Sequence, residues 1–367
     1  MIINMVKYKE KRKVSKIMAY SYKAISDNVK LVGRTYFDGE KLWCGLSGSG
    51  ISFKFRGTKC DITIGGDNIA TSDDEKSKAR FAILVNGDRV IDDIVTYNEK
   101  TYSVISSESE VACVITLIKL SESAMSALSV NGIEICGEIL PADKKDKFIE
   151  FIGDSITCGY GVDDEDENHN FSTSTEDVTK AYAYRTAKAM DVDYSMVSYS
   201  GYGIISGYTG DGVRNEKELV PPYYENPAFT YGSFGDVKPQ DLSWDFTERQ
   251  PDIIVINLGT NDDSFCLEFE ERRIEYCEKY VDFLKVVRKN NPDSKIVCCL
   301  GIMTERLCPY VEKTVADYTA ATGDNNISTL RFTMQLPEDG LAANYHPTAA
   351  THKKAAAKLA AYLKTII

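Results

Sequence analysis

The chain has 367 residues, more than the roughly 250–300 at which one hydrophobic core stops growing, so two domains are expected. It is 43% hydrophobic and 27% charged without a biased tract, which excludes a fibrous or disordered protein. The net charge of −12 argues against nucleic acid or an anionic membrane surface as its main partner.

Residues 1–29 are basic and polar and are predicted to form an N-terminal extension. They contain no apolar run of the length that a secretion signal needs, so a cytoplasmic protein is expected, with secretion left open. No later stretch approaches the ~20 apolar residues of a membrane span.

Residues 30–140 alternate apolar and polar side chains in short runs, such as 51–55 and 60–64, with glycine-containing turns between them. This pattern predicts half-buried strands. Asn86-Gly87 lies between two apolar runs, which is the strongest short signal for a hairpin. With no long helix among these strands, an antiparallel β-sandwich is expected.

The polar segment 141–147 contains a proline and several charges and is predicted to be the linker. In residues 148–367, short β-branched runs alternate with segments of helical periodicity such as 270–290, and residues 351–367 form a closing amphipathic pattern. This alternation predicts an α/β domain with a parallel sheet and helices on both faces.

Ten cysteines are scattered without a Cys-x-x-Cys pair, several of them inside apolar runs, so buried reduced thiols are expected. The three histidines have no metal-ligand spacing with any cysteine, and no metal site is predicted.

Three polar positions follow apolar runs, where ligands bind in open α/β sheets. Ser155 comes two residues after Gly153, Asn261 follows the run 253–257, and His346 precedes the last helix. A hydroxyl, an amide and an imidazole suit acyl transfer, in which an oxyanion must be stabilised and a proton removed. Each alone has a simpler interpretation: a helix cap, a turn or a packing residue.

Together, the segments GDSIT, GTND and HPT resemble the first, third and fifth blocks of the SGNH (GDSL-type) hydrolases. The resemblance implies that Ser155 is the nucleophile, His346 the base, and the Ser155 amide and Asn261 side chain oxyanion donors. The family's second block supplies a glycine amide, for which Gly201 is the first choice and Gly203 the alternative.

A narrower resemblance covers nearly the whole chain. The opening VGRTYFDGEKLWCGLSGSGISFKFRGT, the GDSITCGYG and SGYG segments, and the ending YHPTAATHKKAA are similar to carbohydrate esterase family two. That family joins a jelly-roll sandwich to an SGNH domain and deacetylates sugars and polysaccharides such as xylan. The resemblance implies a carbohydrate acetylesterase acting on substrates such as acetylated xylo- or manno-oligosaccharides, without a cofactor.

The sequence departs from the broad SGNH pattern at Ala343, where an aspartate three residues before the histidine is usual. An orienting group normally fixes the imidazole tautomer and stabilises the imidazolium. Some relatives use a serine–histidine dyad whose ring is held by a backbone carbonyl, so a dyad is predicted, with Asp339 and Glu338 as alternative orienting groups.

Candidate substrate contacts are Asp154, Tyr202, Trp244 and Tyr345; the aromatic rings among them offer stacking faces for a sugar, although core packing is the simpler interpretation. Two other functions remain open: a lipase or thioesterase on the same framework, and a carbohydrate-binding protein with a decayed hydrolase domain. Chain-length preference and labelling by a fluorophosphonate would separate them.

Overall fold

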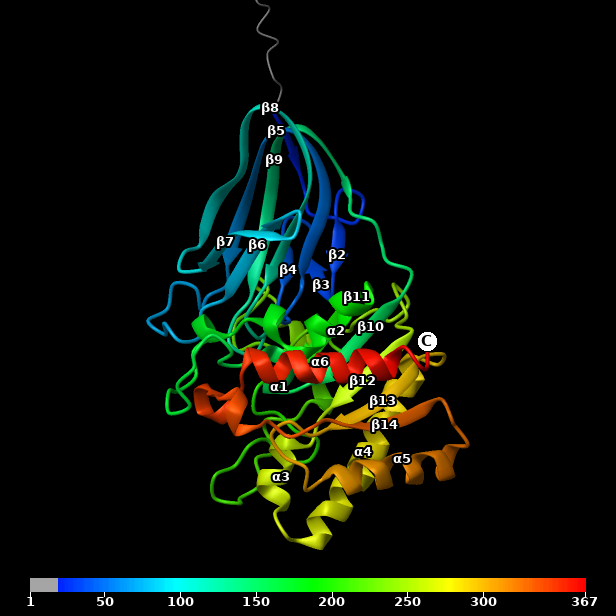
Figure 1. Ribbon diagram of the computed structural model, residues 1–367. Helices are drawn as coiled ribbons and strands as arrows, with labels where there is room; N and C mark the ends of the chain where they lie inside the picture. The colour runs from blue at the N-terminus through cyan, green and yellow to red at the C-terminus, as the bar shows by residue number, and fades with distance from the viewer. Residues whose placement is uncertain (1–18) are drawn as a thin grey trace, which may run out of the picture.

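A computed structural model describes residues 19–367, which form two domains (Figure 1). An antiparallel domain precedes a domain with a parallel sheet between helices, so the predicted fold class is confirmed. Among residues 19–367, no helix combines the length and apolar character needed to cross a membrane.

The antiparallel domain contains one connected network of strands. Their bounds are β1 Tyr20–Tyr22, β2 Lys30–Val32, β3 Thr35–Phe37, β4 Leu42–Cys44, β5 Gly50–Gly66, β6 Arg80–Val85, β7 Asp88–Ile94, β8 Glu99–Lys119 and β9 Leu128–Pro141. The order β3-β4-β9-β5-β8-β6-β7 is completed by β1 on β9 and β2 on β5.

The long strands β5, β8 and β9 extend through both halves of a sandwich and connect them. The register of β5 shifts between Gly57 and Lys59, and bulges of this kind bend a strand. On one side of the bend β5 pairs with the part of β8 that joins β6, and on the other with the part of β9 that joins β1 and β4. The halves enclose one core, in which Phe53 and Leu117 meet Ile62 and Ile133.

The second domain is built on a five-stranded parallel sheet in the order β11-β10-β12-β13-β14. The strands are β10 Phe148–Gly153, β11 Asp193–Ser198, β12 Ile253–Asn257, β13 Lys295–Leu300 and β14 Ile327–Arg331, with a small antiparallel pair of β15 Leu341–Ala342 and β16 His346–Pro347. The helices are α1 Ser155–Cys158, α2 Tyr182–Met190, α3 Thr260–Cys266, α4 Glu270–Asn290, α5 Cys308–Thr322 and α6 Ala349–Leu363.

Side chains of the parallel sheet alternate between two cores. Ile152 and Ile254 lie in the core shared with α4 and α5, whereas Phe151 and Val255 lie in the core shared with α2 and α6. Burial on both faces explains the near-continuous apolar runs in the sequence, because parallel strands are covered by helices on each side. The C-terminal ends of β10 and β12 are adjacent, since Gly153 pairs with Asn257.

The domain boundaries differ from the predicted ones at the N-terminus. Most of the predicted extension lies outside the described residues, but Tyr20–Tyr22 pairs with β9, so the antiparallel domain begins before residue 30. The predicted boundary at 30 was too late because a three-residue strand gives little periodicity to read. Between Pro141, the last residue of β9, and Phe148, the first of β10, the chain forms neither helix nor strand.

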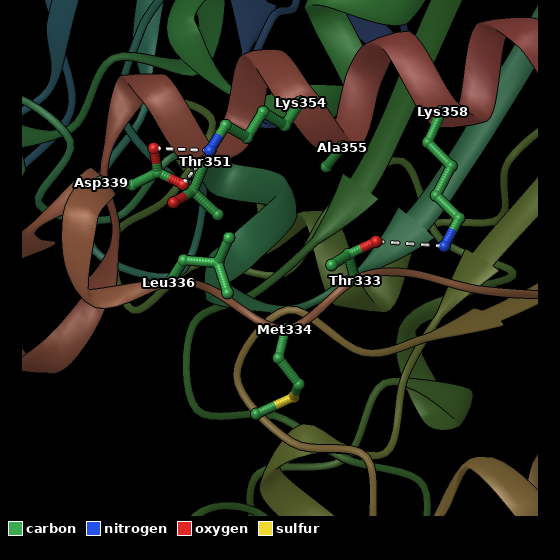
Figure 2. A pocket seen from close by; sticks show the side chains of 8 residues that line it. All are labelled: Thr333, Met334, Leu336, Asp339, Thr351, Lys354, Ala355 and Lys358. Atoms are coloured by element: carbon green, nitrogen blue, oxygen red, sulfur yellow. Dashed lines mark hydrogen bonds and ion pairs between the residues drawn. The ribbon is translucent and has the colours of Figure 1, made fainter.

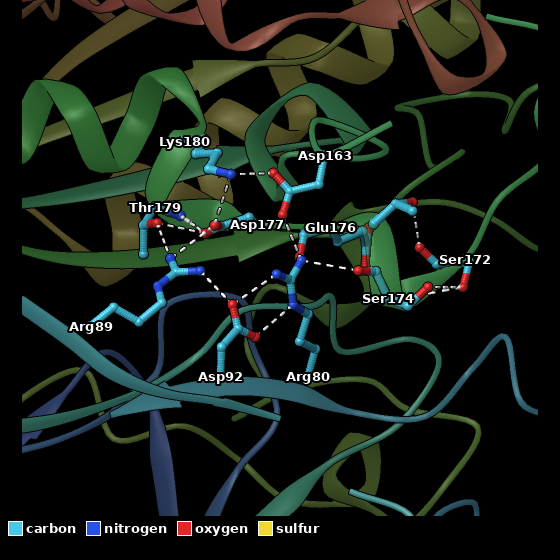
Figure 3. Close-up of polar contacts among 11 residues, drawn as sticks. Arg80, Arg89, Asp92, Asp163, Ser172, Ser174, Glu176, Asp177, Thr179 and Lys180 are labelled. Atoms are coloured by element: carbon cyan, nitrogen blue, oxygen red, sulfur yellow. Dashed lines mark hydrogen bonds and ion pairs between the residues drawn. The ribbon is translucent and has the colours of Figure 1, made fainter. Parts of the chain in front are cut away.

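Polar contacts join the domains at several places, among them an ion pair at Arg34 and another at Arg80. Buried Arg34 of the antiparallel domain forms an ion pair of 3.0 Å with buried Glu150 of β10. Figure 3 shows a second of these places, where the β6–β7 hairpin meets the segment 163–180: Arg80 contacts Asp163 at 2.8 Å. Buried charges are costly to leave unpaired, so the Arg34–Glu150 pair favours the arrangement in which the two domains meet at this point.

Candidate active site

Ser155 follows β10, an interior strand of the parallel sheet, and begins the four-residue helix α1. A side chain at Gly153 would place its Cβ 2.1 Å from the Thr157 hydroxyl, so the tight exit from the strand requires glycine. Asp154 caps α1 by accepting a 3.0 Å hydrogen bond from the amide of Ile156. These contacts hold Ser155, which is 5% exposed, at the C-terminal edge of the sheet.

His346 reaches Ser155 from a point 191 residues further along the chain. Its Nε2 lies 2.8 Å from Ser155 Oγ, which is hydrogen-bond distance. Burial lowers the pKa of His346 to about 4, partly opposed by hydrogen bonds to the carbonyls of Asn344 and Ala343. The ring is therefore neutral near pH 7 and able to accept a proton.

The other ring nitrogen of His346 faces backbone carbonyls. Its Nδ1 is 3.2 Å from the Ala343 oxygen and 3.1 Å from the Asn344 oxygen. A carbonyl can only accept, so these contacts favour the proton on Nδ1 and leave Nε2 as the acceptor facing Ser155. Asn344 and Tyr345 have φ values of 51° and 62°, an uncommon conformation that costs energy and often occurs at functional sites.

Tyr160 covers one face of the His346 ring, with ring centroids 3.9 Å apart and an interplanar angle of 23°. The Asn344 side-chain amide donates a 2.5 Å hydrogen bond to the Tyr160 hydroxyl. Asn344 thus contacts the ring through its carbonyl and the stacking partner through its amide, which fixes both the position and the tilt of the imidazole.

The two acidic alternatives do not orient the ring. Asp339 forms an ion pair with Lys354 of α6 at 2.7 Å, on the wall of a small pocket of about 70 Å³ (Figure 2). His346 and Ser155 do not line that pocket. Glu338 is exposed and has no hydrogen bond to the ring. The position left by the missing aspartate is taken by backbone carbonyls.

Asn261 lies in the first turn of α3, directly beyond β12. Its side-chain amide donates a 2.8 Å hydrogen bond to the Tyr202 carbonyl. One amide hydrogen is used by this bond, which orients the group and leaves the second hydrogen for another acceptor. Asn261 is only 6% exposed, so that acceptor would be bound in a largely dry environment.

Gly201 and Gly203 differ in the state of their amides. The Gly203 amide donates to the Glu218 carbonyl at 3.0 Å, whereas within residues 19–367 the Gly201 amide has no protein acceptor. Gly201 also has a φ of +84°, which favours glycine. Of these two amides, that of Gly201 is the one without a protein acceptor in the described part of the chain, and its role as an oxyanion donor stays a prediction.

Asp262 is a supporting residue that the motif comparison did not single out. It is fully buried and accepts hydrogen bonds from the amides of Ile204, Ile205 and Ser206, between 2.7 and 3.1 Å. Burial raises the pKa of Asp262 to about 6, although these donors oppose the shift. It ties the loop after Gly201 to α3; the only sequence signal was its place next to Asn261.

Two candidate substrate contacts are buried. Asp154 is fully inaccessible and serves as the cap of α1, and burial raises its pKa to about 7. Tyr202 is 2% exposed and packs against Tyr199 and Phe229. Asp154 therefore supports the helix that begins with Ser155, Tyr202 belongs to an aromatic cluster, and neither side chain is exposed to a substrate.

The other two candidates are separated from each other. The Trp244 ring lies 5.4 Å from the guanidinium of Arg34, which pairs with Glu150 in the first half of β10, before the edge that carries Ser155. Trp244 therefore belongs to the domain interface. Tyr345 is 55% exposed beside His346 and keeps an accessible ring.

No cluster of three or more histidine, cysteine or acidic side chains suited to a metal occurs among residues 19–367. His352 is fully buried and accepts a 3.2 Å hydrogen bond from the Tyr182 amide through its Nδ1, a structural role.

The serine beyond β10 is hydrogen-bonded to a histidine, and the asparagine lies beyond the neighbouring strand β12. This is the arrangement expected of an SGNH-type hydrolase. Residues 151–354 match the model of the GDSL-like lipase/acylhydrolase family, and the chain belongs to that family. Residues 31–142 match the model described as carbohydrate esterase 2 N-terminal, so the resemblance to family two is confirmed over both domains.

The relatives are carbohydrate esterases, that is, carboxylic ester hydrolases. The chain is 30% identical over 330 residues to a cellulase/esterase from Acetivibrio thermocellus, matching 88% of this chain and spanning 37% of that protein's length. It is 24% identical over 361 residues to an acetylxylan esterase/glucomannan deacetylase from Cellvibrio japonicus, covering 94% of this chain and 90% of that protein.

Two solved structures share the two-domain fold. A family two carbohydrate esterase from Clostridium thermocellum, in complex with cellohexaose, superposes with a TM-score of 0.79 at 29% identity, over 92% of this chain and 98% of the other. An acetyl xylan esterase from Butyrivibrio proteoclasticus, 22% identical, shares the fold with a TM-score of 0.85, over 95% of this chain and 98% of the other.

Proposed function

We propose that this protein is a serine esterase that removes acetyl groups from carbohydrates such as acetylated xylo- or manno-oligosaccharides. The observation that carries the proposal is the 2.8 Å contact between Ser155 Oγ and His346 Nε2 at the strand-end edge of an SGNH-type sheet. A neutral imidazole at that distance can accept the hydroxyl proton as the serine attacks an ester carbonyl.

In the proposed mechanism, Ser155 Oγ attacks the acetyl carbon while its proton moves to His346 Nε2. The carbonyl oxygen becomes an oxyanion that accepts hydrogen bonds from the amides of Ser155 and Gly201 and from the Asn261 side chain. One such donor typically lowers the barrier by about 2.7–4 kcal/mol. The imidazolium then protonates the leaving sugar oxygen, and water hydrolyses the acetyl-enzyme with His346 again as base.

A dyad without an acidic member is sufficient for this mechanism. The carbonyls of Ala343 and Asn344 accept the Nδ1 proton, and Tyr160 packs on the ring face. Aromatic faces attract cations, so this stacking favours the imidazolium that forms in the transition state. Asn344 and Tyr160 together would do what a carboxylate does elsewhere in the family.

The acetyl and carbohydrate parts of the proposal rest on the relatives. Their names include acetylxylan esterase and glucomannan deacetylase, and one related structure holds cellohexaose. The proposed substrate is therefore a neutral, acetylated oligosaccharide, with Tyr345 the exposed aromatic candidate for contact with a sugar ring.

Acetate release from acetylated xylo-, manno- and gluco-oligosaccharides tests the proposal, with Ser155→Ala as the blank. We expect release by the wild-type protein and none by the variant, at unchanged melting temperature. Full activity in Ser155→Ala would remove the nucleophile assignment. A preference for long acyl chains on p-nitrophenyl esters would replace the proposal with the lipase or thioesterase alternative, and failure to react with a fluorophosphonate would favour a decayed site.

A further inference from the structure

Glu122 belongs to the antiparallel domain, in the segment between β8 and β9, yet its carboxylate touches the proposed oxyanion hole. It is fully buried, and its Oε2 accepts a 2.6 Å hydrogen bond from the backbone amide of Ser200. Ser200 directly precedes Gly201, whose amide is the free donor described above. The same oxygen is 3.8 Å from the thiol of Cys158, the last residue of α1, the helix that begins with Ser155.

The backbone of Glu122 is also fixed. Its amide donates a 2.9 Å hydrogen bond to a carboxylate oxygen of Glu176, and its carbonyl accepts a 2.7 Å hydrogen bond from the ammonium of Lys119. Lys119 and Glu176 are fully buried as well. Because the Glu122 backbone is fixed, its side chain can hold the Ser200–Gly201 turn at a fixed distance from the antiparallel domain.

Charged groups are costly to bury, and apolar side chains of similar volume would close an interface at lower cost. Burial raises the pKa of Glu122 and of Glu176 and lowers that of Lys119 to about 8. Burying Lys119, Glu122 and Glu176 therefore lowers the stability of the folded protein beside the candidate site, because these charged groups lose their hydration. A functional reason for retaining this destabilising burial would be that the Glu122 carboxylate holds the backbone of the candidate site in place.

We propose that Glu122 is a positioning residue for the esterase reaction: by accepting the Ser200 amide, it fixes the Ser200–Gly201 peptide so that the Gly201 amide points at the reacting carbonyl oxygen. This inference rests on the proposed function, because it assumes that Gly201 is an oxyanion donor. It also gives the antiparallel domain a part in the reaction, since one wall of the oxyanion hole is held from that domain.

The local backbone explains why such support is needed. Gly201 adopts a φ of +84°, and glycine can leave that conformation more easily than other residues. Ser200 and Gly201 lie in a turn outside the strands and helices, so the sheet alone does not fix the direction of the Gly201 amide. A donor displaced by about 1 Å can reduce the rate of a positioned reaction on the order of a hundredfold.

The test compares Glu122→Met, which removes the acceptor at similar size, and Glu122→Gln, which keeps a weaker one, with Glu176→Gln as the matched control. Glu176→Gln also neutralises a buried acid of the cluster but leaves the contact with Ser200. The measurements are kcat and KM on p-nitrophenyl acetate, the second-order rate of Ser155 phosphonylation by a fluorophosphonate, and the melting temperature.

We expect Glu122→Met to lose about ten- to a hundredfold in kcat and in phosphonylation rate, with KM changed by less than about threefold. Glu122→Gln should lose about three- to tenfold, because an amide oxygen accepts the Ser200 amide less strongly than a carboxylate does. Glu176→Gln should lose less than about twofold, because its amide oxygen can still accept the Glu122 amide and the contact of Glu122 with Ser200 is kept. If Glu122 were only structural, its variants would change the melting temperature, but kcat would not fall in the order Glu176→Gln, Glu122→Gln, Glu122→Met.

Wild-type rates in both Glu122 variants, or an equal loss in Glu176→Gln, would overturn the inference. If Glu122→Met does not fold, the phosphonylation rates of Glu122→Gln and Glu176→Gln are compared. A rate at least threefold lower in Glu122→Gln supports the role, and a smaller difference rejects it. A wild-type protein that hydrolyses no acetyl ester would refute the proposed function instead, and the phosphonylation rates would still decide the role of Glu122.

Discussion

Ser155 and His346 meet at 2.8 Å but are held by very different structures. Ser155 follows an interior strand of the sheet, and its position is fixed by neighbours in the chain: Gly153, which permits the tight exit, and Asp154, which caps α1. His346 follows a loop with two consecutive residues in the left-handed region, and its ring is held by carbonyls and by Tyr160.

The histidine loop depends on contacts with a distant segment. The Ala343 amide donates to the Asp164 carbonyl and the Asn344 amide to the His169 carbonyl, both at 3.1 Å. That segment is in turn bound to the antiparallel domain through Asp163 and Arg80. The comparison teaches that the proposed nucleophile is positioned by a few local residues, whereas the proposed base, which has no carboxylate partner, is held by long-range contacts.

The comparison predicts that both side chains are needed equally, although only one is locally fixed. We expect His346→Ala to reduce kcat on p-nitrophenyl acetate about 10⁴-fold or more, similar to Ser155→Ala, because members of such a unit act together. Kinetic measurement of both variants and the double variant checks this. A double variant much slower than either single variant would show that the two side chains act separately.

The pH dependence separates a buried dyad from an ordinary histidine. The pKa of His346 is lowered to about 4, so the neutral, reactive form persists as the pH falls until that value is approached. At pH 5 a histidine with the usual pKa would be only about 3% neutral, a roughly 30-fold loss of rate. We expect kcat/KM to be nearly unchanged between pH 7 and pH 5.

The measurement is a pH profile of kcat/KM on a substrate whose own ionisation is silent in that range, with protein stability followed at each pH. An acid limb with a midpoint near 6.5 would show that burial of the ring does not govern its protonation in solution.

The parts of the molecule that the sequence predicted correctly are those encoded by residues close together in the chain. Asn86-Gly87 predicted the β6–β7 hairpin, and both residues have positive φ values of 53° and 93°, as such a turn requires. The helical period of residues 270–290 matched α4 from end to end. Gly153 and Ser155 stand where the end of an apolar run predicted a strand exit, because a strand and its exit are encoded by adjacent residues.

The residues that support the site were less accessible to sequence reasoning. Glu122 and Asp262 act through buried carboxylates that accept backbone amides far away in the chain, and no periodicity reveals such a partner. Trp244 was considered a sugar platform because it is aromatic, but it stacks on Arg34 at the domain interface. The helix that begins at Ser155 is a single turn, because Gly159 caps and ends it.

The support of the histidine can be weakened without removing the base. Tyr160→Leu removes both the stacked ring and the hydroxyl that accepts from Asn344, whereas Tyr160→Phe removes only the hydroxyl. We expect kcat to fall about tenfold in the first variant and about threefold in the second, because a cation–aromatic contact and a hydrogen bond are each worth on the order of 1 kcal/mol. Steady-state kinetics with melting temperatures as the control would check the order; equal activity in all three proteins would contradict the role of the stack.

The smallest effect is expected at the acidic residue nearest in sequence to the missing aspartate. Asp339 is paired with Lys354 on α6, and the Nδ1 atom of His346 already faces two carbonyls. Asp339→Ala should therefore change kcat by less than about twofold and cost up to about 1 kcal/mol of stability, the usual limit for an exposed ion pair. Lys354→Ala is the matched control, because it breaks the same pair and leaves the carboxylate. If Asp339→Ala lowered kcat by three orders of magnitude in a folded protein while Lys354→Ala did not, the carboxylate itself would be the third catalytic group, and backbone carbonyls would be insufficient to hold the histidine.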